Sequence, residues 1–187
     1  MLKIADQIFE IEHFSFCQSL TIGQNGWHVS WCLGCEAKAK EVEKLTWAPS
    51  VRSHYFSSLV QNPEELHNLK IALPDRDPED NEPMFLLYVF EHEAIRNVEL
   101  SFGEWKNNEI NVSFKGISNV YASEIYGSNL PINFEFNWKY TGIYVDEGEE
   151  AWAVKKFSQF FNPDNFFPPE SLGKASGFMF RPRNQKT

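Results

Sequence analysis

Apolar and polar residues alternate with a period of two through residues 94–145, and this pattern restricts the fold more than any other feature. Turn-forming residues at 106–108 and 126–131 separate the alternating runs. The runs place apolar side chains at Val98, Leu100 and Phe102, at Ile110, Val112 and Phe114, at 120–125, at Ile132, Phe134, Phe136 and Trp138, and at Ile143 and Val145. Such alternation is typical of half-buried strands. We therefore expect four or five antiparallel strands within about 50 residues, as in a meander or a sandwich.

The N-terminal part of the chain predicts a β-hairpin. Residues 7–22 read as one strand, and residues 27–35 as a second that turns Trp27, Trp31 and Leu33 toward one face. Between them, Gly-Gln-Asn-Gly at 23–26 suits a tight turn, because glycine and asparagine tolerate positive φ. A dense apolar run at 84–90 predicts a further strand that is buried on both faces.

Other segments have helical patterns. Residues 36–45 are rich in Ala, Lys and Glu, and residues 52–60 place apolar side chains at helical spacing. Asn62 followed by Pro63 is typical of a helix start, and this helix would bury Leu66 and Leu69. The remaining expected elements are a helix at 149–161, which Asn162-Pro163 ends, and a last strand at 177–180.

These patterns predict an α+β fold: mostly antiparallel β-sheet of meander or sandwich type, with two or three short helices. We expect a single globular domain over residues 1–187, because no flexible linker and no repeat of 20–50 residues divides the chain. A chain of 187 residues buries about 70% of its surface, which suffices for a core without metals or disulfides. With 42% hydrophobic residues, intrinsic disorder is excluded.

The hydropathy pattern argues against a membrane span or an export signal. The longest strongly apolar run, at 84–90, is far shorter than the roughly 20 residues that a spanning helix needs. The first seven residues carry charge and lack an apolar signal core. We therefore expect a cytoplasmic protein that does not interact with membranes.

The chain is acidic, with 26 Asp and Glu against 17 Lys and Arg and a net charge of −9. This balance disfavours binding to nucleic acid, whose affinity comes largely from cationic contacts. The acids gather in two clusters, Asp75, Asp77, Glu79, Asp80 and Glu82, and Asp146, Glu147, Glu149 and Glu150. Two readings stay open: a solvated surface that maintains solubility, or an electronegative face that steers a basic partner.

Three cysteines raise the question of a metal site. Cys32 and Cys35 form half of a zinc knuckle, and Cys17 with His28 or His13 would complete it. Residues three apart on a strand point to opposite faces, however, which argues against such a site. We expect no metal and no cofactor, and reduced thiols rather than structural disulfides. A redox Cys-x-x-Cys pair would need a strand-to-helix turn, which a helix from Glu36 onward would supply.

Other catalytic and binding motifs are weak or missing. Counted from Asp75, a calcium loop would have Asp80 in place of glycine at position six and Leu86 in place of glutamate at position twelve. No nucleophile or nucleotide-binding motif occurs, and His92 lies between acids that would face away from it on a strand. The aromatic residues favour a core over a sugar-stacking platform, because most have core-facing parity.

The segments 109–116, 126–131 and 134–136 resemble the sheet of small acidic immunity-type proteins that accompany bacterial polymorphic toxins. The resemblance is confined to these segments and rests on strand and turn residues, so it assigns no site residues. It implies a bacterial, cytoplasmic, non-catalytic protein that binds and blocks a protein partner.

The leading hypothesis is therefore a toxin-neutralising protein-binding module that acts through the two acidic clusters. One alternative is a small-ligand-binding protein, or an enzyme, whose site is assembled only in three dimensions. Another is a metal-stabilised domain centred on the cysteines. The oligomeric state stays open.

Overall fold

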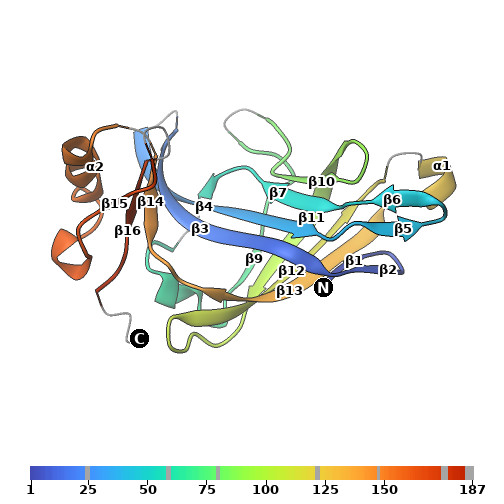
Figure 1. The fold of residues 1–187 in the computed structure, drawn as a ribbon, viewed down its shortest axis with the longest axis horizontal. Coiled ribbons are helices and arrows are strands. Elements are labelled where there is room, and N and C mark those ends of the chain that lie inside the picture. Colours follow the sequence, from blue (N-terminus) through green and yellow to red (C-terminus); the bar gives the residue numbers. More distant parts are fainter. Residues whose placement is uncertain are drawn as a thin grey trace.

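The computed structural model describes residues 1–23, 26–57, 60–78, 81–120, 123–146, 148–173 and 177–183. Most of them belong to one large, curved, mixed β-sheet (Figure 1). Its strands, in the order in which they pair, are β15 (Glu170–Ser171), β16 (Phe178–Phe180), β14 (Ile143–Val145), β3 (Ile11–Gly23), β4 (Gly26–Ala37), β7 (Ser50–Ser53), β10 (Phe85–Tyr88), β11 (His92–Phe102), β12 (Glu109–Ser118), β13 (Leu130–Lys139), β1 (Leu2–Ile4) and β2 (Gln7–Phe9). In addition, β8 (Phe56–Ser57) pairs with β4, and β9 (Lys70–Ala72) pairs with β11.

The expected meander is present as three antiparallel strands, β11, β12 and β13. Inward-facing Ile110, Val112 and Phe114 are all buried, as the alternation predicts. The expected fifth strand at the end of the run is placed differently, because β14 leaves the meander and pairs in parallel with β3. Residues 121–122 of the expected strand at 120–125 lie outside the described residues, and Ser123–Tyr126 forms one helical turn, α1.

The predicted N-terminal hairpin is confirmed as β3 and β4, which pair from Ile11↔Ala37 to Gly23↔Gly26. Residues 7–22 are not one strand, because β2 ends at Phe9 and pairs with β1 instead. The strand at 84–90 is confirmed as β10, but it is not buried on both faces. Phe85 and Leu87 are buried, whereas Tyr88 is 40% exposed.

Two of the predicted helices are wrong. Residues 36–45 contain the end of β4, the strand β5 (Lys40–Val42) and the start of β6 (Leu45–Trp47), which pairs with β5. Residues 52–60 contain the end of β7 and the strand β8. In both segments tertiary burial overrides helix-forming composition, since Val42 and Phe56 are buried in the core from an extended backbone.

The helical content is accordingly smaller than expected. Asn62 does cap a helix, but this helix is a single 3₁₀ turn, η1 (Pro63–Leu66), and a second such turn is η2 (Pro163–Asn165). The predicted helix near the C-terminus is confirmed as α2 (Glu150–Phe157). In the part of the chain that the structure describes, α2 is the only α-helix longer than one turn, and no helix is long and apolar enough to cross a membrane.

The sheet curves so that the β3–β4 hairpin packs over the meander through aromatic side chains. Phe16 lies 4.7 Å from Trp138 and Phe14 lies 3.5 Å from Phe136, measured between ring centroids. Helix α2 covers the end of the sheet near β16, where the rings of Phe157 and Phe180 stack 3.9 Å apart. The aromatic residues therefore build mainly the core, as their parity predicts.

Candidate functional site

The first acidic cluster lies in the loop that precedes β10. Asp75 is exposed, and its Oδ1 accepts a hydrogen bond of 2.7 Å from the backbone N–H of Asn97. Asp77 is half-buried and its backbone bonds to Glu82 across the loop at 2.8 Å. Glu79 and Asp80 lie outside the described residues. Leu86, the twelfth position of the calcium pattern, lies in β10 as part of the sheet.

The second acidic cluster lies between β14 and α2. Asp146 is half-buried, and its Oδ1 accepts a 2.9 Å hydrogen bond from the hydroxyl of Tyr144. Burial, and secondarily this bond, raise the pKa of Tyr144. Glu149 occupies the N-cap position of α2 without a side-chain capping bond, and Glu150 begins the helix; both are exposed, and Glu147 lies outside the described residues. In Figure 1, α2 stands at one end of the molecule and β10 beyond the middle, so the two clusters occupy different regions of the surface.

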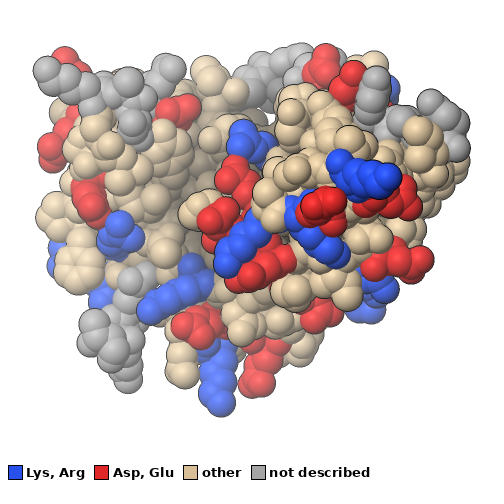
Figure 2. Space-filling view, turned by 45° about the vertical axis from the view of Figure 1, so that its right-hand side comes forward, with Lys and Arg blue, Asp and Glu red and all other residues tan. Residues whose placement is uncertain are grey.

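Basic and acidic side chains are interspersed on the end of the molecule that carries β5 and β6 (Figure 2). Lys38 pairs with Glu10 and Arg52 pairs with Glu36, each at 2.7 Å. Positive and negative side chains are therefore mixed at this end of the molecule, whereas the start of α2 carries the two acidic residues Glu149 and Glu150.

A groove of about 450 Å³ adjoins the second acidic cluster. Its rim is aromatic, since Trp27 and Trp152 meet edge to face with ring centroids 5.2 Å apart. Ile22 is 70% exposed and Tyr55 is 43% exposed beside them. The groove is lined by Leu20, Thr21, Ile22, Trp27, Tyr55, Asp146, Gly148 and Trp152. We call it the Asp146 groove.

Asp146 is the one charged residue among the described residues that line the Asp146 groove. Burial, and then the neighbouring Cys32, Cys17 and Asp146, raise the pKa of Tyr55 to about 12, so its hydroxyl stays neutral. Nearby, the Nζ atom of Lys156 lies 5.4 Å from the ring centroid of Trp27. This distance is within the range of a cation–π interaction, so the protein's own Lys156 lies against the ring of Trp27 at the rim.

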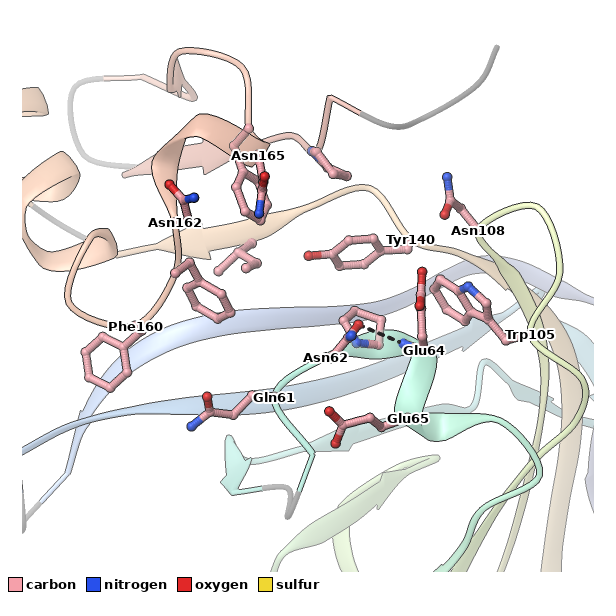
Figure 3. Close-up of a pocket in the computed structure, with 15 residues that line it drawn as sticks. Gln61, Asn62, Glu64, Glu65, Trp105, Asn108, Tyr140, Phe160, Asn162 and Asn165 are labelled. Atoms are coloured by element: carbon pink, nitrogen blue, oxygen red, sulfur yellow. Dashed lines mark hydrogen bonds between the residues drawn. The ribbon is translucent and has the colours of Figure 1, made fainter.

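A second concavity, of about 490 Å³, opens between η1 and η2 (Figure 3). Each of these turns has the same cap: Asn62 Oδ1 accepts from the backbone N–H of Glu64, and Asn162 Oδ1 accepts from that of Asp164, both at 3.1 Å. The caps use the side-chain oxygens of the two asparagines, and both asparagines line the concavity. We call this concavity the amide cleft.

Aromatic and amide side chains share the walls of the amide cleft. Figure 3 shows Glu64 rising from η1 toward Tyr140 and Trp105, with Asn162 and Asn165 on the opposite side. Tyr140 is 6% exposed, and its hydroxyl donates to Gln18 Oε1 at 3.4 Å. The lining is Gln61, Asn62, Pro63, Glu64, Glu65, Trp105, Asn108, Tyr140, Ile143, Phe160, Phe161, Asn162, Asn165, Phe166 and Pro182.

The cysteines and His28 do not gather into a metal site. Cys17 and Cys32 lie opposite each other on β3 and β4, with their Sγ atoms 2.7 Å apart. Cys35 is fully buried, and burial raises its pKa to about 12. His28 lies farther along the hairpin, opposite Thr21. Among the described residues, no group of three His, Cys, Asp or Glu side chains is placed to hold a metal ion.

The sequence analysis did not predict a site at the residues of the amide cleft, although one sequence pattern marks them. The tripeptides Asn62-Pro63-Glu64 and Asn162-Pro163-Asp164 repeat an Asn-Pro-acid pattern 100 positions apart. No family model matches this sequence, and comparisons with curated proteins and with solved structures found no match.

Proposed function

We propose that this protein is a non-catalytic binding module that neutralises a basic protein partner, as the resemblance to toxin-immunity proteins implies. The observation that carries the proposal is the Asp146 groove, in which one carboxylate lies among Trp27, Trp152 and Tyr55. Tryptophan and tyrosine dominate the binding energy of protein interfaces, and they do so in pockets from which water is displaced.

The occupant that best matches this groove is an arginine or lysine side chain of the partner. Its charged head would reach Asp146, while its aliphatic stem would lie against the indole rings. Exposed Ile22 adds apolar surface at the rim. Glu149 and Glu150 at the start of α2 supply the steering field, which acts mainly on the association rate.

The test is the association rate of the isolated partner, measured at about 50 mM and about 500 mM salt, where screening lengths differ roughly threefold. We expect high salt to slow association, and the double variant E149K/E150K to slow it several-fold at low salt. D146N is expected to act mainly on dissociation, because it removes a charge that is buried in the complex.

The matched control is E41K/E43K, which reverses two exposed acids on β5 and its turn, away from the groove. It makes the same change of net charge as E149K/E150K. If both double variants slow association equally, only net charge matters and the Asp146 groove is not the contact. If salt and all three variants leave both rates unchanged, the proposal fails.

The amide cleft supports a second candidate function, the binding of a small polyhydroxylated ligand such as a sugar. Its lining combines ring faces for stacking with amides and carboxylates that pair with hydroxyl groups, and none of its lining residues is basic. Titration with a panel of neutral sugars, followed by tryptophan fluorescence, is the direct test.

We expect W105A and N165A to abolish the response to sugars, while N137A, on the exposed side of β13, leaves it intact. A response to choline in place of sugars would identify a cation site made by Glu64, Glu65 and the rings. A response to neither ligand would remove this candidate.

A further inference from the structure

We infer that Cys17 and Cys32 form a reversible cross-strand disulfide when the protein meets a low-molecular-weight disulfide such as glutathione disulfide. The inference concerns the outer face of the β3–β4 hairpin and is independent of both proposed binding functions. It departs from the expectation that the thiols stay reduced.

Geometry provides the first support. Cys17 and Cys32 are direct partners in the antiparallel register, where opposite Cα atoms lie about 4.5–5.5 Å apart, within the span of a disulfide. Their Sγ atoms are 2.7 Å apart, roughly 0.7 Å more than a sulfur–sulfur bond. Closing the bond therefore requires adjustment of two side chains and no movement of the strands.

Access provides the second support. Cys32 lines a surface hollow of about 340 Å³ together with Ser15, Gly34 and Arg52. A Cβ atom at Gly34 would lie 2.7 Å from Ser15 Oγ, so Ser15 and a larger residue at position 34 would compete for the same space beside the hollow. The rim of the hollow also carries Arg52 and Glu36, which pair with each other at 2.7 Å.

The relative acidity of the two thiols identifies the sulfur that attacks. A hydrogen bond from the Cys17 thiol stabilises the thiolate of Cys32 and lowers the pKa of Cys32. The same bond, with burial, raises the pKa of Cys17. Cys32 is thus the sulfur that ionises first, and the thiolate is the nucleophile in disulfide exchange.

The reaction balances in two steps. The Cys32 thiolate attacks one sulfur of glutathione disulfide, whose sulfur–sulfur bond breaks, and one glutathione leaves as a thiolate. Cys17 then loses its proton to water and attacks Cys32 Sγ, which expels the second glutathione. In sum, two protein thiols are oxidised by two electrons, and one glutathione disulfide is reduced to two thiols.

Cys35 serves as the internal control, because it is three residues from Cys32 and faces the core. After incubation with glutathione disulfide, intact-mass measurement of the wild type should show the loss of two hydrogen atoms. Thiol titration after denaturation should then fall from three groups to one. C35S should lose the same two hydrogen atoms and retain no free thiol.

The single variants separate the steps. C17S should accumulate one glutathione on Cys32, since no second thiol expels it, and C32S should react much more slowly. Circular dichroism establishes that each variant is folded. The inference is overturned if the wild type keeps three free thiols or if it retains bound glutathione, as C17S is expected to do. It is also overturned if the oxidised product is a disulfide-linked dimer.

Discussion

At the scale of single residues, Gly142 decides where the chain goes after the meander. It lies between β13 and β14 with φ of +132°, a backbone conformation that side chains disfavour. A Cβ atom at this position would collide with the carbonyl oxygen of Phe180 in β16. Gly142 thus allows β14 to turn away and pair with β3 and β16.

The prediction at this scale compares two alanine substitutions. G26A meets only the cost of positive φ, about 1–2 kcal/mol, because no atom lies within 4 Å of the added Cβ. G142A adds a collision with backbone, which we expect to cost a further 1–3 kcal/mol or so. Urea unfolding of both variants measures the difference; equal losses of stability would mean that the close contact at Gly142 is relieved without cost.

At the scale of elements, the contact of Phe157 with Phe180 holds α2 to the sheet, and the helix-forming tendency of α2 itself contributes less. A helix of eight residues is too short to be stable alone. Phe157 is fully buried and stacks on Phe180, with further ring contacts to Phe161 and Phe166. Because α2 also carries Trp152, Glu149 and Glu150, this contact positions one side of the Asp146 groove.

We therefore expect F157A to destabilise the protein by about 3–5 kcal/mol, the usual cost of removing a buried phenylalanine. F167A is the matched control, since Phe167 is 52% exposed, and we expect it to change stability by less than about 1 kcal/mol. Denaturant unfolding gives both values. Similar values for the two variants would contradict a central role for the Phe157 contact.

At the scale of the whole molecule, buried acidic groups couple stability to alkaline pH. Burial raises the pKa of Cys35 from 9.0 to about 12 and raises the pKa of Tyr140 above its ordinary value of 10.0. Each group ionises at lower pH in the unfolded chain than in the folded one. The unfolded state thus binds fewer protons in this range, and stability falls as pH rises.

We predict that the stability contributed by these two groups is fully present below pH 9 and is progressively lost above it, with a slope of up to about 1.4 kcal/mol per pH unit for each linked proton. C35A should reduce the slope from pH 9 upward, and Y140F should reduce it only above pH 10. Free energies of unfolding measured between about pH 8 and pH 11 decide the matter. A flat or rising profile in the wild type would contradict the assignment.

Features that depend on local periodicity could be predicted from the order of the residues alone. Alternation at Val112 and Phe114 identified the inward face of the meander, because side chains of a strand alternate between two faces whatever its partners are. The same rule correctly separated Cys35 from Cys32. The capping role of Asn62 could be predicted for an equally local reason, because the hydrogen bond from the backbone N–H of Glu64 to Asn62 Oδ1 spans only two residues.

The tertiary structure alone decided the features that join distant segments. Residues 36–45 are extended and not helical, and the neighbouring Trp47 packs its ring against Phe9, Phe90 and Tyr126, which lie far along the chain. The parallel pairing of β14 with β3 and the approach of η1 to η2 likewise depend on how the sheet curves. Composition and spacing carry no record of such long-range contacts, because their free energy appears only when the whole core is packed.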